Sequence, residues 1–191
     1  MKKNLKPRAI MYPAPAAIAS AYDEKGNTDA CTLAFAAMCS HKPPCIMIAI
    51  NSTLKRKTLK DILEREEFCI GFPNTDQVAE ADYLGIETGY NTNKIEKIKF
   101  TTTPAEKINA PIINEFNVSI ECKVKNITNI GSHTQIIAEI VNIQAEENLI
   151  NDNGRINLKK LNPIVYDDVE YNYYEVGEKI ADAFNVGKKF K

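Results

Sequence analysis

The sequence predicts a mainly β protein, an antiparallel β-barrel with a few short helices. Several short segments alternate between apolar and polar residues or are apolar throughout, as strands are, and only two stretches have a helical period. The eight glycines never form GxGxxG or a Walker A motif, so nothing indicates the parallel α/β sheet of a Rossmann or P-loop protein. With no repeat and no linker, residues 1–191 are expected to form a single domain.

The first half of the chain contains a predicted hairpin, a buried strand and a helix. Two short apolar runs, residues 16–22 and 28–35, flank the turn sequence DEKGN. The run CIMIAI at 45–50 is apolar throughout, which predicts a strand buried on both faces. Residues 58–66 (TLKDILERE) change to a helical period, and Thr58 with Asp61 resembles a capping pair.

The second half returns mostly to strands. Residues 67–73 (EFCIGFP) alternate, 76–84 predict a short helix, and 85–93 (GIETGYNTN) predict a polar loop. The clearest strand is VSIECKV at 118–124, and TQIIAEIVNIQAE at 134–146 is its expected partner after the turn NIGSH. The chain ends in an aromatic-rich stretch and a weakly helical tail.

Charge and hydropathy exclude several classes of function. The net charge of −1 and the pI near 6.2 argue against a nucleic-acid-binding protein that works by bulk electrostatics. The basic first residues lack the apolar stretch of a signal peptide, and no apolar run approaches the roughly 18 residues of a transmembrane helix. We therefore expect a cytoplasmic protein that does not enter a membrane, and any anion site in it must be local.

The cysteines and histidines predict no metal site. The five cysteines form no CxxC pair and no Cys/His knuckle, and the two histidines, His41 and His133, are isolated. The apolar neighbours of the cysteines favour reduced, buried thiols that pack as small hydrophobic groups.

The stretch NSTLKRKT at 51–58 is the strongest candidate for a binding site. Three cations stand directly before Thr58, the first predicted helical residue, where the helix dipole is already positive. Such a cluster favours an anion: Arg56 offers a planar fork, and Ser52, Thr53 and Thr58 offer hydroxyls, a set that suits phosphate. A solvated charged turn before a surface helix is the alternative.

Three other side chains have both a functional and a structural interpretation. His133 follows a glycine turn at a strand start, from which it can reach a ligand in the barrel opening, although such a histidine is commonly structural. Lys94 in the polar loop is by default an exposed lysine, and Tyr166 after NPIV a core or rim aromatic. No side chain is an obvious acid–base catalyst.

Taken in order, these segments resemble a known family. Residues 16–73, with strand, DxxGNxxAxT, SxxPP, apolar strand, RxT, helix and EFxxxxP, are similar to flavin reductase-like proteins, which bind FMN in a split β-barrel. The later GSH before a strand and the ending Y…Y…GE.I..AF..GK resemble the flavoredoxin and ferric-reductase-like branch of that family. The resemblance covers nearly the whole chain and implies an antiparallel split β-barrel.

The resemblance also implies a site. The anion would be the FMN 5′-phosphate, held by Arg56, Thr58 and the hydroxyls of Ser52 and Thr53. The remaining positions match residues that line or approach the isoalloxazine ring in the family: Asp29, Ala30, Cys31, Thr32, Phe35, Lys94, His133 and Tyr166.

Three positions depart from the family pattern. Asp29 stands where flavoredoxin-like proteins commonly have Asn, Phe35 where they can have Trp, and NKIEK replaces the more usual DKF. Asp29 then either faces the pyrimidine edge of the ring or is a surface carboxylate beside a turn.

By resemblance, the protein is an FMN-binding homodimer with the flavin near the subunit interface. It would pass electrons from NAD(P)H through FMN to flavin or ferric acceptors, and the chemistry would belong to the flavin. One alternative is a flavoredoxin-like carrier that holds FMN and exchanges electrons with protein partners. A second alternative is a structural or ligand-binding barrel that binds no flavin.

Overall fold

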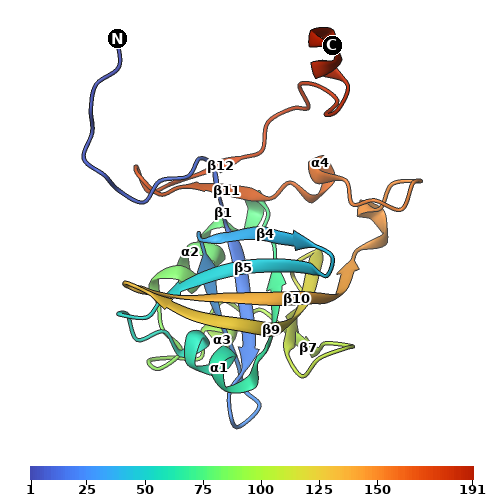
Figure 1. Cartoon of the computed structure of the whole chain (residues 1–191). Coiled ribbons are helices and arrows are strands. Elements are labelled where there is room, and N and C mark those ends of the chain that lie inside the picture. The colour runs from blue at the N-terminus through green and yellow to red at the C-terminus, as the bar shows by residue number, and fades with distance from the viewer.

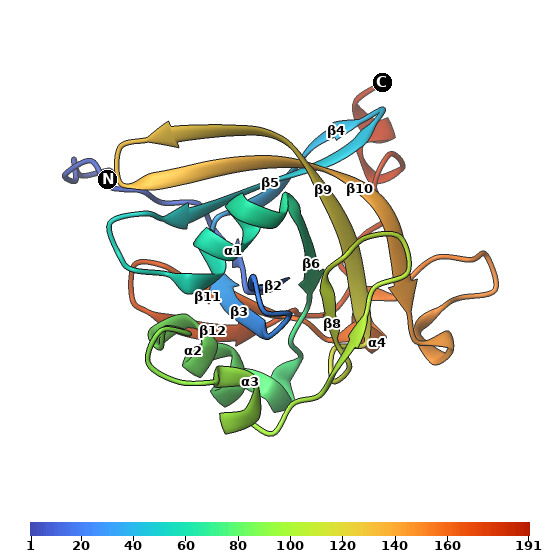
Figure 2. The same ribbon diagram turned by 90° about the horizontal axis from the view of Figure 1, so that it is seen from below.

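A seven-stranded antiparallel sheet curls into a barrel (Figures 1 and 2) in the computed structural model, which describes residues 1–191. The strand order is β3-β2-β6-β9-β10-β5-β4. The bounds of these strands are β2 Ala17–Tyr22, β3 Thr28–Leu33, β4 Ala36–His41, β5 Pro44–Asn51, β6 Glu67–Gly71, β9 Val118–Ile130 and β10 His133–Ala145.

The barrel closes through a bend in the chain. Strands β3 and β4 lie at opposite edges of the sheet, yet only Ala34 and Phe35 separate them in sequence. The N–H of Ala49 on β5 donates to the carbonyl of Phe35 at 2.9 Å, which fixes the bend against the sheet. The predicted antiparallel barrel, the hairpin of β2 with β3 and the pairing of β9 with β10 are all confirmed.

Helix α1 (Lys57–Arg65) packs into one end of the barrel, between β5 and β6 in the view of Figure 2. Its apolar face adds Leu59 and Ile62 to the barrel core, where Ile48, Phe68 and Ile136 are fully buried. Each such side chain removed from water contributes roughly 1.5–3 kcal/mol. Because this face is anchored in the core, the start of α1 has a fixed position.

A second apolar cluster covers the outside of the barrel at β2 and β3. It is formed by α2 (Val78–Ile86), which follows the 3-10 turn η1 (Thr75–Gln77), and by the short α3 (Lys94–Lys97). The predicted helix at 76–84 is thus present, shifted by two residues. The predicted loop 85–93 begins only at Glu87, and the NKIEK segment forms α3.

The remaining elements lie around the barrel. A small sheet joins β1 (Ala14–Pro15), β11 (Ile164–Asp167) and β12 (Asn172–Glu175), and β7 (Thr102–Pro104) pairs with β8 (Pro111–Ile113). The short helices η2 (Glu147–Leu149), α4 (Leu158–Leu161) and η3 (Val186–Phe190) complete the chain. None of the helices has the length and apolar character needed to cross a bilayer.

Three local predictions are wrong. The strand at 45–50 is not buried on both faces, because Met47 and Ala49 are only half-buried and line a cavity. Thr58 and Asp61 form no capping pair, since α1 already starts at Lys57. Cys39 lies exposed on the edge strand β4, whereas the other four cysteines are buried as expected. The predicted weakly helical tail is confirmed in part, since it contains the exposed η3 turn.

Candidate functional site

Helix α1 starts without a side-chain cap. Arg56 occupies the N-cap position in an extended conformation, and its side chain accepts no hydrogen bond from the helix. The first helical bond runs from the N–H of Lys60 to the carbonyl of Arg56 at 3.5 Å. The backbone N–H groups of Lys57, Thr58 and Leu59 therefore have no protein acceptor, which leaves the positive end of the helix dipole available to an anion.

The three cations at this helix start are not equivalent. The ammonium of Lys57 points inward and pairs with Asp61 at 2.7 Å and Asp23 at 3.2 Å. Burial alone would lower the pKa of Lys57, but these two carboxylates outweigh it and raise that pKa. Burial also raises the pKa of Asp61. Only Lys55 and Arg56 remain to face an anion, which corrects the prediction of three cations acting together.

The loop before the helix start is held by Asn51. Its side-chain oxygen accepts from the N–H of Thr53 at 2.9 Å, from the Thr53 hydroxyl at 2.7 Å and from the N–H of Leu54 at 3.1 Å. The N–H of Ser52 donates to the carbonyl of Ser132 at 2.9 Å, which ties this loop to the turn before His133. Ser52 and Thr53 are exposed, so their hydroxyls can reach a ligand.

Arg56 fixes the polar segment after α2 against this loop. Its guanidinium donates to the carbonyl of Glu87 at 3.0 Å, and the hydroxyl of Thr88 donates to the carbonyl of Lys55 at 2.7 Å. A cavity of about 910 Å³ lies between the loop before α1 and the segment after α2, and Ser52, Arg56 and Tyr90 help to line it. An anion at the helix start would compete with the Glu87 carbonyl for Arg56.

Behind the helix start, Asp29 belongs to a buried polar cluster. The hydroxyl of Thr58 donates to one of its carboxylate oxygens at 2.6 Å, and the ammonium of Lys94 lies 3.3 Å from the other. Lys94 also donates to the carbonyl of Ala30. Asp29 is 2% exposed and Lys94 1%, so the interpretations as a surface carboxylate and an exposed lysine are wrong.

Gly89 closes this cluster from the outside. A Cβ atom at that position would lie 2.3 Å from a carboxylate oxygen of Asp29, so only glycine allows so close an approach. Neither Gly89 nor the Glu87 carbonyl was predicted as part of a site. The second glycine of GIETGYNTN was the available signal.

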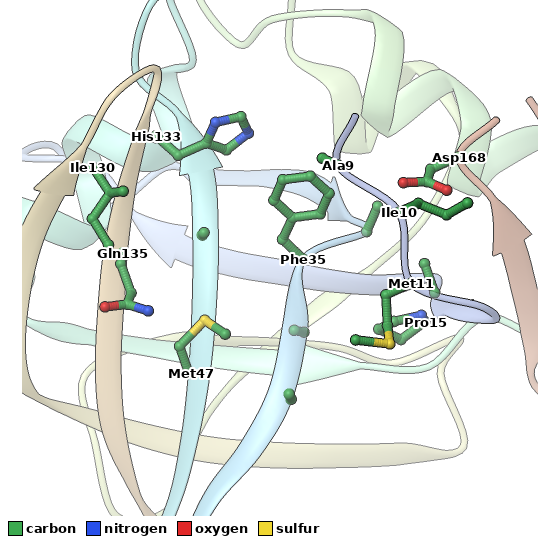
Figure 3. Close-up of a pocket in the computed structure, with 15 residues that line it drawn as sticks. Ala9, Ile10, Met11, Pro15, Phe35, Met47, Ile130, His133, Gln135 and Asp168 are labelled. Carbon is green, nitrogen blue, oxygen red and sulfur yellow. The ribbon is translucent and has the colours of Figure 1, made fainter. Parts of the chain in front are cut away.

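A second part of the candidate site is formed by Phe35 and His133. Their rings stack with centroids 4.9 Å apart and an angle of 25° between the planes. They help to line a mostly apolar cavity of about 450 Å³, to which β5 contributes Met47 and the N-terminal segment contributes Ile10 and Met11 (Figure 3). No local pattern predicted the last three residues, because the contact joins the N-terminus to strands far along the chain.

Thr32 and Tyr166 meet in a third cavity, of about 180 Å³, between β3, α2 and β11. Tyr173 lies beside Tyr166 with ring centroids 5.3 Å apart, and its hydroxyl donates to Asp82 at 3.1 Å. Burial is the main reason why the pKa of each tyrosine is raised. The phenols therefore stay protonated and can donate hydrogen bonds at neutral pH.

The last two predicted residues, Ala30 and Cys31, are buried within β3, and burial raises the pKa of the Cys31 thiol. The predicted residues thus border separate cavities around β3 and the start of α1. No group of three or more His, Cys, Asp or Glu side chains is placed to hold a metal ion. The helix start suits phosphate, and the stacked and tilted aromatic pairs suit a planar ring system.

Comparisons with known proteins show the family and the fold of this chain. The model of the family described as flavin reductase like domain matches residues 9–175. Flavoredoxin of Desulfovibrio vulgaris (Miyazaki F) is 34% identical with a TM-score of 0.92, over 98% of this chain and 100% of that one. Flavoredoxin from Methanosarcina acetivorans is 24% identical with a TM-score of 0.92 over the whole of both chains. An FMN-binding protein from Thermus thermophilus is 18% identical with a TM-score of 0.79, over 95% of this chain and 100% of that one.

Proposed function

Because the chain belongs to the family of flavin reductase-like domains, we propose that it binds FMN with the phosphate at the start of α1. The observation that carries the proposal is the uncapped helix start, where three N–H groups lack a protein acceptor. Arg56 would supply a charge-assisted donor there once it leaves the Glu87 carbonyl. The exposed hydroxyls of Ser52 and Thr53 donate to the Ser132 carbonyl and to Asn51, so each would exchange that acceptor for the phosphate. Thr58 supports the site from behind, because its own hydroxyl is bonded to Asp29.

We assign the ring of FMN to the other predicted residues. The backbone of Asp29, Ala30, Cys31 and Thr32 would line the isoalloxazine ring, with Phe35, His133 and Tyr166 approaching it from neighbouring segments. Lys94 positions this part of β3, since its ammonium holds both the Ala30 carbonyl and the Asp29 carboxylate. These assignments rest on the family pattern and on the planar character of the aromatic pairs.

The activity that the site supports best is that of a flavoredoxin-like electron carrier. The chain is 34% identical to a flavoredoxin over almost its whole length, and no side chain is placed as an evident acid–base catalyst. Bound FMN would supply the electron transfer, while the protein holds the phosphate and covers parts of the ring. We assign this function to one domain, residues 1–191, working as a homodimer with a protein electron donor and acceptor.

A second candidate function is NAD(P)H-dependent reduction of flavin or ferric acceptors. The cavity beside Phe35 and His133 favours it, because about 450 Å³ of mostly apolar space next to a stacked aromatic pair admits a planar donor. Without a Rossmann domain, a nicotinamide would have to reach an exposed face of the flavin through this opening.

Two measurements separate the candidates. An absorption spectrum of the purified protein before and after desalting shows whether FMN is held, and a colourless protein that fails to bind added FMN contradicts the proposal. Steady-state oxidation of NADH and NADPH with added FMN then distinguishes carrier from enzyme. A carrier retains its flavin and gives almost no turnover, whereas a reductase turns over many times per molecule.

A further inference from the structure

Lys57 is the first residue of α1, yet its ammonium turns away from the helix start. Side chains of a helix lean toward its N-terminus, so a lysine at this position can reach a ligand bound there. Instead, the ammonium lies 2.7 Å from Asp61, one turn further along the helix, and 3.2 Å from Asp23 in the β2–β3 turn. A cation that could face the proposed phosphate is therefore held behind it.

The carboxylate of Asp61 is only half satisfied. Its side chain is fully buried, and one of its oxygens accepts from Lys57 while the other, Oδ1, has no hydrogen-bond partner. Asp23, by contrast, also accepts from the N–H groups of Lys25 and Asn27 in its own turn. A buried carboxylate oxygen without a donor is rare in native proteins and calls for an explanation. The turn gives Asp23 a structural role, whereas the one partner of Asp61 is Lys57.

Charge behind the helix start is not balanced. The charged groups that face Asp61 come from three elements: α1 supplies Lys57, the β2–β3 turn supplies Asp23, and β3 supplies Asp29. Because Lys94 already pairs with Asp29, the ammonium of Lys57 alone serves the other two carboxylates. The remaining charged side chains of α1 lie at the surface or bind the carbonyl of Asp23: Lys60, Glu64 and Arg65. Asp61 is thus the least compensated of the three aspartates.

We propose that Asp61 withholds Lys57 from the phosphate and releases it when Asp61 takes up a proton. This inference rests on the proposed function, because it concerns the ligand of the same helix start. With Asp61 ionised, the phosphate is held by backbone N–H groups and Arg56. With Asp61 neutral, Lys57 keeps only Asp23 and can turn to the phosphate. Asp61 is therefore a positioning residue that acts through Lys57 and sets how tightly the site holds an anion.

A bound phosphate itself favours this release. A phosphate monoester carries between one and two negative charges near neutral pH, so it repels the Asp61 carboxylate and attracts the freed ammonium. Burial already raises the pKa of Asp61, which brings its protonation closer to neutral pH. Asp23 competes weakly for Lys57, because the donors of its own turn already hold its carboxylate.

The first test is calorimetric titration of FMN and riboflavin near pH 8. Asp61→Asn should bind FMN about three- to fivefold more tightly than wild type, the scale of one ion pair near the surface. Riboflavin, which has no phosphate, should bind both proteins equally. The double variant Lys57→Met/Asp61→Asn should return to the wild-type affinity for FMN, because the ammonium that carries the gain is gone. A gain that survives in the double variant would be an effect of charge alone and would overturn the role of Lys57.

Glu64→Gln is the matched control. It removes one negative charge from the same helix, at an exposed residue that pairs with Lys60, and should leave the affinities for both flavins unchanged. Unfolding followed by circular dichroism shows whether each variant keeps its fold. An unchanged FMN affinity in a folded Asp61→Asn would overturn the proposal.

The second test is the pH dependence of FMN affinity in wild type and in the double variant, which leaves no unpaired charge at either position. Lowering the pH from about 8 to about 5 should protonate Asp61 and free Lys57 in wild type alone. The affinity of wild type relative to the double variant should therefore rise severalfold. Ionisation of the phosphate is common to both proteins and cancels in this ratio. A constant ratio would overturn the release of Lys57 by a proton.

The same titrations separate this inference from the proposed function. A wild type that binds no FMN refutes the proposed function and this inference with it. FMN binding that is weakened by Arg56→Ala but unaffected by Asp61→Asn refutes this inference alone.

Discussion

Asp29 and Glu121 are both buried carboxylates, but their partners differ in kind. Glu121 accepts from four neutral donors: the N–H groups of Glu106 and Lys107, and the amides of Asn142 and Gln144. Asp29 has one hydroxyl, from Thr58, and one cation, Lys94. Glu121 fastens the loop between β7 and β8 to the β9–β10 hairpin, far along the chain from the helix start.

This difference in partners distinguishes a carboxylate that only stabilises the fold from one that also belongs to the candidate site. Neutral donors satisfy Glu121 completely and leave nothing for a ligand. The partners of Asp29 also hold other parts of the candidate site, because Thr58 lies in the first turn of α1 and Lys94 holds the Ala30 carbonyl. Substitutions around Glu121 should therefore change stability alone, whereas those around Asp29 should change stability and flavin binding together.

Lys94→Met should have the largest effect. It leaves Asp29 as a buried charge without its cation, which costs about 3–5 kcal/mol of unfolding free energy. Denaturant unfolding followed by circular dichroism measures this loss. The double variant Lys94→Met/Asp29→Asn should recover more than half of it. A single variant within about 1 kcal/mol of wild type would show that the pair is not an isolated buried charge pair.

Glu121→Gln should cost about 2–3 kcal/mol, since the new amide turns its own N–H groups toward donors and leaves some of them unpaired. FMN affinity should stay unchanged in Glu121→Gln, whereas it should change in Lys94→Met. Glu24→Gln, at an exposed residue of the β2–β3 turn, is the matched control for the loss of one negative charge. Weakened FMN binding in Glu121→Gln would contradict the claim that Glu121 affects stability alone.

The same carboxylate predicts a pH dependence. Burial alone would raise the pKa of Glu121, but hydrogen bonds from Asn142, Lys107, Gln144 and Glu106 outweigh it and hold that pKa below its ordinary value of 4.5. Its contribution is thus present above the unfolded pKa and is lost as the pH falls through the folded one. The stability difference between wild type and Glu121→Gln should narrow below about pH 4.5, and a constant difference would contradict this.

Arg56→Ala should weaken FMN binding by about 1.5–3 kcal/mol, the scale of a lost charge-assisted hydrogen bond. Riboflavin, which lacks the phosphate, should bind both proteins almost equally. Calorimetric titration with the two flavins makes the measurement. An equal loss of affinity for both flavins would show that Arg56 does not contact the phosphate and that the cluster is a solvated turn. Lys60→Ala, which removes an exposed cation of α1 paired with Glu64, is the control for charge alone.

Asp29→Asn should cost stability, because it leaves the Lys94 ammonium buried without its carboxylate, and the smallest expected effect is its shift of the reduction potential of bound FMN. Removing a negative charge near the ring favours the reduced, more negative flavin, so the potential should rise by tens of millivolts, given that about 30 mV corresponds to 1.4 kcal/mol for two electrons. Lys94→Ala should shift it the opposite way. Spectroelectrochemical titration decides, and unchanged potentials would place both residues away from the ring.

The sequence predicted the barrel because its strands carry their own periodicity. The alternation in residues 118–124 and the apolar face of residues 58–66 appear in the structure with only small shifts of boundary. The start of α1 was predicted within one residue, because the helical period of residues 58–66 begins there, although the predicted capping pair does not form. Burial was not predicted: from local sequence alone Lys94 and Asp29 were expected at the surface, and only the family resemblance placed them at a site, because a lysine in a polar loop gives no sign that it is paired.

The candidate site was predicted through the family pattern rather than through local physics. Nothing in NSTLKRKT indicates that Lys57 points inward to Asp61 and Asp23, because those partners are identified only once the chain is folded. The stacking of Phe35 on His133 joins residues almost a hundred positions apart, and no periodicity reports such a contact.

The most direct test of the account is a crystal structure of the protein grown with FMN. The phosphate should lie at the start of α1, with its oxygens accepting from the N–H groups of Lys57 to Leu59 and from Arg56, whose guanidinium should have left the Glu87 carbonyl. A phosphate bound anywhere else, such as in the cavity beside Phe35 and His133, would contradict it.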